Sequence, residues 1–148
     1  MKTWRYLTIL LASLSMAMAF SHLLQLPVRM GYTLQQYLTT QSHFQLYGSV
    51  GAVIEPGAIL AGIVLTVLVR RRIPARSLTL AGTVCLAAAF VVWLVFVAPA
   101  NVHIASWTAE ADPLGWTAIR ARWEYAHAAR AVLLIAGLSL LVWSVLVE

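Results

Sequence analysis

The chain has few charged residues and a single cysteine, and both shortages exclude whole classes of protein. Charged residues make up 10% of its 148 positions, whereas a soluble domain carries about 25%. Water is therefore not the main solvent of the folded chain. The lone cysteine, Cys85, excludes an intrachain disulfide and a thiolate metal cage. Apolar residues account for 61% of the sequence, which indicates an integral membrane protein.

Four apolar stretches are long enough to cross a bilayer as helices, which takes about 20 residues each. So few segments cannot close a β-barrel, and helices are the remaining structure that satisfies the backbone in lipid. The sequence therefore predicts an all-α, four-transmembrane-helix bundle that forms a single integral membrane domain over residues 1–148. The helices are expected at about 4–26, 47–69, 77–98 and 114–147.

The ends of these helices carry less regular signals. Asp112 and Pro113 are typical of the cap and first turn of the last helix. The third helix is expected to end at Ala98, before Pro99. The first stretch also resembles a signal peptide, with Ala17-Met18-Ala19 as its cleavage site. Its apolar run continues to residue 26, which favours a retained span.

Basic residues predict the orientation of the bundle. The short turn 70–76 carries four arginines, so it is expected in the cytoplasm, together with both termini. Lys2 and Arg5 near the start agree with this orientation. Basic residues that flank apolar segments indicate contact with the lipid bilayer and no nucleic-acid partner. High alanine, leucine and arginine content with a single lysine favours a bacterial inner (plasma) membrane.

Ionisable residues inside the spans are the candidate functional groups, because such residues are costly in lipid. At about 1.5 Å per residue, Glu55 lies roughly 23 Å from Arg70, and His22 lies roughly 26 Å from Arg5. His127 and Arg130 lie at similar heights on the last helix. Three helices therefore place polar groups in one layer, near the non-cytoplasmic edge of the bundle.

These residues fit more than one kind of site. A histidine–carboxylate set of His22, Glu55, Glu124 and His127, with His103 nearby, suits a single metal ion such as iron, copper or zinc. A bis-histidine haem between His22 and His127 is an alternative, and so is a pocket without a cofactor. The spacing Glu124-x-x-His127 occurs in di-metal carboxylate helices, but a full di-iron site needs a second such motif.

A buried ion-pair network accounts for the same residues without any ligand. In it, Glu55 or Glu124 pairs with Arg120 or Arg130, and the histidines form hydrogen bonds with the pair. Such a network does not exclude function, because a polar cluster in a low-dielectric setting can host acid–base chemistry.

Three short patterns resemble a known family. They are Ser21-His22-x4-Pro27, Asn101-x5-Trp107 and Trp116-x3-Arg120-x-Arg122-Trp123-x3-His127-x2-Arg130. With the helix count, they resemble the anthrone oxygenase-like proteins, small four-helix membrane proteins that are mostly known only as a domain of unknown function. The resemblance implies oxidation of a polycyclic anthrone to an anthraquinone by dioxygen. The expected function is therefore that of a membrane oxidoreductase acting on a lipophilic aromatic (anthrone- or quinol-like) substrate.

The resemblance and the layer together suggest roles for individual residues. The expected catalytic residues are His22, His127, Asn101, Arg120 and Arg130, with either histidine as the general base and the others stabilising an anion. The expected pocket walls are Trp107, Trp116 and Trp123.

A non-catalytic accessory subunit of a larger membrane complex is the alternative function. Small residues on the second helix, in Gly57-x3-Ala61 and Ala58-x3-Gly62, are typical of a face that docks a partner helix. A homo-oligomer is a further possibility for the same face.

Overall fold

The structure is an all-α bundle with four long spans. The computed structural model describes residues 1–108 and 113–147. Its spans are α1 (Lys2–Arg29), α3 (Gln45–Leu68), a third rod over Ile73–Ala105, and α6 (Trp116–Leu146). Each is long and apolar enough to cross a membrane, with mean hydropathies between 1.8 and 2.5. The predicted four-helix transmembrane bundle is therefore confirmed.

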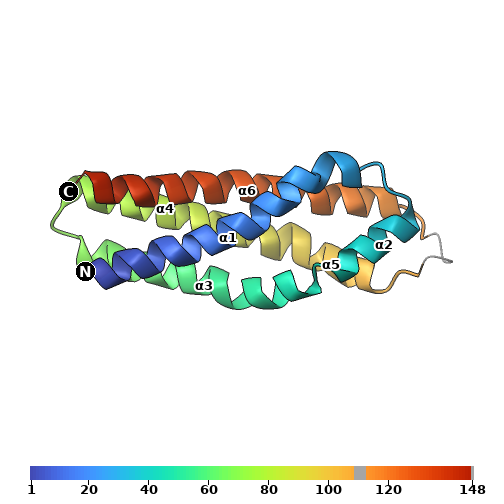
Figure 1. Cartoon of the computed structure of the whole chain (residues 1–148), viewed down its shortest axis with the longest axis horizontal. Helices are drawn as coiled ribbons and strands as arrows, with labels where there is room; N and C mark the ends of the chain where they lie inside the picture. Colours follow the sequence, from blue (N-terminus) through green and yellow to red (C-terminus); the bar gives the residue numbers. More distant parts are fainter. Residues whose placement is uncertain (109–112, 148) are drawn as a thin grey trace.

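The bundle has two different ends. Both chain termini and the turn that joins α3 to the third rod lie at one end (Figure 1). The other end carries the short helix α2 (Leu34–Ser42), the end of the third rod and the start of α6 (Figure 1). The arginine-rich turn 70–72 is thus at the end opposite α2. The cytoplasmic location of that turn and of the termini stays a prediction.

The third rod is longer than the sequence suggested. It consists of α4 (Ile73–Val92), a π-helical turn η1 (Trp93–Val97) and α5 (Ala98–Ala105), so the expected end at Ala98 is wrong. Pro99 has no N–H to donate to the carbonyl of Val95, four residues earlier. The Nη2 of Arg122 on α6 donates to that carbonyl at 3.1 Å. The neighbouring helix thereby stabilises a rod that a proline would otherwise interrupt.

Helix α2 was not predicted, although its start has a recognisable pattern. Thr33 and Gln36 form a capping box, in which Gln36 N donates to Thr33 Oγ1 at 3.3 Å and Thr33 N donates to Gln36 Oε1 at 2.9 Å. The helix buries Tyr37 completely. It thus closes over the end of the bundle where the polar layer was expected.

The last helix begins later than expected. Its first residue is Trp116, and Gly115 before it has a φ of 76°, in the left-handed region that glycine adopts without strain. Pro113 lies in the turn before the helix, where its carbonyl accepts from Trp116 N at 3.1 Å. The expected cap, Asp112, lies outside the described residues.

Small residues set how closely the spans approach. A Cβ at Gly82 of α4 would lie 2.9 Å from the carbonyl oxygen of Gly137 on α6, so these two helices are in backbone contact. On α3, Gly62 packs against Thr83, and Ala58 is buried in the core. The α3 residues expected to dock a partner helix therefore pack within this chain. Near the start of α3, a Cβ at Gly48 would meet nothing within 4 Å, so this part of the helix leaves room for a pocket.

Candidate functional site

The bundle contains a pocket of about 540 Å³ towards the α2 end. Six aromatic side chains line it, from the start of α3, from the third rod and the segment after it, and from α6: Phe44, Tyr47, Phe90, Trp93, Trp107 and Trp123. Its polar lining includes His22, Gln41, Glu55, Asn101, His127 and Arg130. A volume of this size, with a few convergent polar groups, is typical of a site for a small molecule.

Two histidines whose rings are in contact, at an interplanar angle of 39°, belong to this lining. The ring centroids of His22 on α1 and His127 on α6 are 4.2 Å apart, and both residues are buried. Trp123 contacts both rings, at 5.0 Å from His22 and 4.1 Å from His127. The Nδ1 of His22 has no hydrogen-bond partner among the described residues. His22 therefore keeps hydrogen-bonding capacity within an aromatic enclosure.

Arg130 connects the histidine pair to two other helices. Its Nη1 lies 3.1 Å from Nδ1 of His127, and its Nε donates to the carbonyl of Ala89 on α4 at 3.2 Å. Its Nη2 forms an ion pair with Glu55 of α3. Since Arg130 is only 3% exposed, the carboxylate compensates a charge that lipid and protein would otherwise leave unbalanced.

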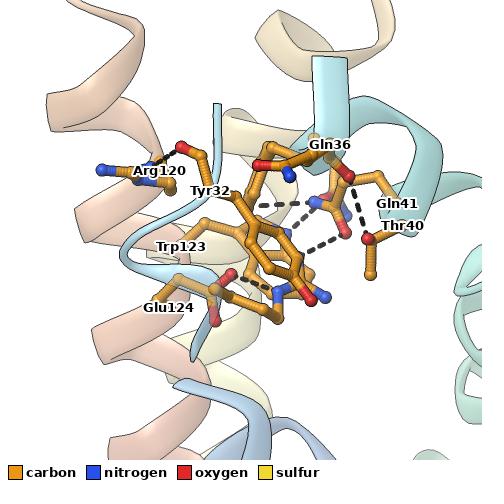
Figure 2. A network of polar contacts seen from close by, with 10 residues as sticks. Tyr32, Gln36, Thr40, Gln41, Arg120, Trp123 and Glu124 are labelled. Carbon is orange, nitrogen blue, oxygen red and sulfur yellow. Dashed lines mark hydrogen bonds and ion pairs between the residues drawn. The ribbon is translucent and has the colours of Figure 1, made fainter. Parts of the chain in front are cut away.

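A second buried ion pair lies beside the pocket, between Arg29 at the end of α1 and Glu124 of α6. Arg29 Nε donates to Glu124 Oε1 at 2.7 Å, and Arg29 Nη2 donates to Gln41 of α2 at 3.0 Å. The guanidinium carbon is 4.9 Å from the ring centroids of Tyr37, Phe44 and Trp123. Figure 2 shows Glu124, Gln41 and Trp123 gathered where α6 meets α2. This network fixes α2 over the pocket.

Arg29 was not among the predicted site residues, although it lies on the same helical face as His22. The surroundings of this pair also act on Tyr37 of α2. Burial, and then the negative charge of Glu124, raises the pKa of Tyr37, which stays a neutral phenol. Its hydroxyl accepts a hydrogen bond from Gln41 Nε2 at 3.3 Å.

Most of the predicted site residues converge. His22, His127, Arg130 and Glu55 are linked by the contacts described above, and Asn101 joins them because its Oδ1 accepts from Trp123 Nε1 at 2.7 Å. Of the expected tryptophans, Trp107 and Trp123 line the pocket.

Arg120 and Trp116 do not line the pocket. Arg120 Nη1 donates to the carbonyl of Tyr32 at 2.7 Å, a bond visible in Figure 2, and its guanidinium lies 4.6 Å from the Trp116 ring centroid. They lie one to two turns before Trp123, at the start of α6, and pack against the connection between α1 and α2. Arg120 is therefore engaged in holding that connection.

The predicted metal-ligand set is not gathered. Within residues 1–108 and 113–147, no three histidine, cysteine, aspartate or glutamate side chains are placed to hold one metal ion. Glu55 pairs with Arg130, and Glu124 pairs with Arg29. The haem alternative also fails on geometry, because ring centroids 4.2 Å apart leave no space for a macrocycle between His22 and His127.

No family model, no curated protein and no solved structure matches this chain. The resemblance to the anthrone oxygenase-like proteins therefore stays a prediction.

Proposed function

We propose that the chain is a membrane oxidoreductase of the oxygenase type, acting on a lipophilic aromatic substrate that is anthrone- or quinol-like. The observation that carries this proposal is an aromatic-walled pocket in which an uncommitted histidine lies beside a buried guanidinium. The chemistry needs a base to remove a proton and a positive environment to stabilise the anion that forms. The pocket lies towards the α2 end of the bundle, opposite the arginine-rich turn 70–72. Because such turns favour the cytoplasm, we propose that the α2 end is on the non-cytoplasmic side of a bacterial inner membrane.

His22 is the better candidate for the base. A neutral imidazole has one nitrogen with a free lone pair. The Nδ1 of His127 is in contact with Arg130, whereas the Nδ1 of His22 has no partner in the described part of the chain. A base also needs to be within reach of the substrate. The Nδ1 of His22 is itself buried, so Nε2 would be the nitrogen that takes the proton in the pocket that His22 lines. The proton of an acidic C–H or phenol would therefore move to His22.

The remaining polar groups suit the anion. The amide of Asn101 and the ring of His127 line the cavity, and so does Arg130, whose charge Glu55 balances. In this low-dielectric enclosure such groups act more strongly than in water. Arg120 has no part in this scheme, because it does not line the pocket.

The reaction balances with dioxygen as the oxidant. For an anthrone, loss of the benzylic proton to His22 leaves a stabilised carbanion that forms a C–O bond with dioxygen. The peroxide anion that results takes the proton back from His22, and the hydroperoxide then loses water to give the anthraquinone, so each substrate consumes one dioxygen and releases one water. The carbanion can react with dioxygen directly, and the scheme requires no further electron donor.

The test is turnover of anthrone by the detergent-purified protein, followed by dioxygen consumption and anthraquinone absorbance. We expect His22→Gln to abolish turnover, because glutamine keeps much of the shape and cannot accept the proton. His103→Gln is the matched control, since His103 is exposed on α5 and does not line the pocket. Equal turnover in the two variants would remove the base assignment. Loss of turnover on chelation would overturn the cofactor-free scheme.

The alternative, a non-catalytic accessory subunit, has less support. The small residues of α3 that suggested a docking face, Ala58 and Gly62, pack inside the bundle. Purification of the chain as a stable particle on its own favours the enzyme, and dependence on a second protein for stability favours the subunit.

A further inference from the structure

We infer that Arg130, held in place by Glu55, fixes His127 as a hydrogen-bond donor, so that the pocket recognises a carbonyl or phenolate oxygen of its ligand through His127 Nε2–H. This inference rests on the proposed function and deepens it. It divides the histidine pair into an acceptor, His22, and a donor, His127. Arg130 is then a positioning residue, and the oxygen atom next to the reacting carbon is the feature by which the ligand is selected.

The contact between Arg130 and His127 determines which nitrogen of the imidazole carries the proton. A guanidinium has five N–H donors and no acceptor, and it stays protonated in proteins. A hydrogen bond of 3.1 Å between Arg130 Nη1 and His127 Nδ1 therefore requires the lone pair of Nδ1. A neutral imidazole has one such nitrogen, so its single proton is on Nε2. A doubly protonated ring would point an N–H at the guanidinium.

Two further contacts keep the guanidinium of Arg130 in this position. Arg130 also donates from Nε to the carbonyl of Ala89 and pairs with Glu55 through Nη2. Three partners on α3, α4 and α6 leave its planar fork one orientation, in which Nη1 faces His127. Glu55 lies one residue before Pro56 in α3 and itself borders the pocket. Removing its charge would leave Arg130 buried without a counter-ion and free it to turn.

The other nitrogen of the His127 ring, Nε2, is left for a ligand. Since Nδ1 is engaged, the remaining hydrogen-bonding capacity of the ring is the Nε2–H, and His127 lines the pocket. The ring that carries this donor contacts His22, and the two ring centroids are 4.2 Å apart. A ligand with an acidic proton near a carbonyl or phenol oxygen complements both histidines: the proton faces His22, and the oxygen accepts from His127 Nε2–H. Anthrones, quinols and hydroxyquinones have this arrangement, whereas a plain aromatic hydrocarbon does not.

The tautomer can be measured without any turnover, by nitrogen NMR of the protein labelled with ¹⁵N-histidine in detergent micelles. We expect the His127 signals, assigned from the His127→Gln variant, to show an unprotonated Nδ1 and a protonated Nε2. We expect both tautomers in Arg130→Met and in Glu55→Gln. A protonated Nδ1 in the native protein would overturn the inference. A single unchanged tautomer in Glu55→Gln would overturn the role of Glu55.

The donor role is tested by binding of anthraquinone, which offers carbonyl oxygens and has no benzylic proton to lose. His127→Gln keeps an N–H donor, and His127→Leu has none. We expect the leucine variant to bind about 2- to 10-fold more weakly than the glutamine variant, the range for one neutral hydrogen bond. Equal affinity in the two variants refutes the donor role.

Failure of the proposed function looks different. In that case anthrone is not turned over, while the tautomer and the difference in anthraquinone affinity persist. If turnover depends on His22 and the tautomer is absent, the inference alone is wrong.

Discussion

The buried ion pair between Arg29 and Glu124 is expected to dominate the stability of the α2 end of the bundle. Both side chains have 0% exposure, and Arg29 Nε lies 2.7 Å from Glu124 Oε1. Replacing one partner leaves the other charge buried without compensation, which costs about 3–5 kcal/mol. We therefore expect Arg29→Met and Glu124→Gln each to lower the free energy of unfolding by about that amount.

The double variant separates this mechanism from simple loss of packing. When both charges are removed, no uncompensated charge remains, so the double variant is expected to be more stable than the sum of the single effects by about 2–3 kcal/mol. This coupling should not change with salt, because ions do not screen a fully buried pair. Exposed Arg76 provides the control, and Arg76→Met is expected to change stability by less than about 0.5 kcal/mol.

Unfolding by sodium dodecyl sulfate in mixed micelles, followed by circular dichroism, measures these differences. Additive single effects would refute the reasoning, since they would mean that neither charge depends on the other.

Three further predictions use the same unfolding assay. Gly82→Ala is expected to lower the free energy of unfolding by about 1–3 kcal/mol, because the added Cβ would lie 2.9 Å from a backbone carbonyl oxygen of α6. The control is Gly48→Ala, which should not destabilise the protein because its Cβ meets nothing within 4 Å. Equal effects of the two substitutions would contradict the close helix contact. Arg122→Ala is expected to cost about 1 kcal/mol by leaving the proline-freed carbonyl without its donor, and no loss would show that the bond is dispensable. Because the folded state raises the pKa of Tyr37, its contribution to stability should be complete below the usual tyrosine value of 10.0 and fall as the pH rises above it. Tyr37→Phe should remove that decline in stability. If the variant loses stability with rising pH as the native protein does, Tyr37 is not its cause.

The layer of polar residues illustrates what could be predicted from sequence. The rise of a helix is constant, so the heights of His22, Glu55, His127 and Arg130 follow from counting residues. The structure links these residues through direct contacts. The choice of partners was harder, because several arginines lie at similar heights and Glu124 pairs with Arg29 rather than with Arg120 or Arg130.

Local signals failed where another helix compensated for them. Pro99 predicted the end of a helix, yet Arg122 of α6 bonds the carbonyl that the proline leaves free, and the rod continues to Ala105. Arg120 and Trp116 belong to the same short pattern as His127. They lie one to two turns before Trp123, where their side chains meet the α1–α2 connection instead of the pocket. Their neighbours depend on which segment crosses above them, which spacing along α6 does not specify.

Sequence by itself determined that this chain is a membrane protein, how many times it crosses, and at what depth its ionisable groups lie. Apolar length and helical rise act within one segment and need no partner. Tertiary structure alone decided which carboxylate meets which arginine, and so which histidine nitrogen is occupied. Hydrogen bonds between helices depend on how the spans rotate and approach, and residues far apart in the sequence, such as Gly82 and Gly137, set that approach.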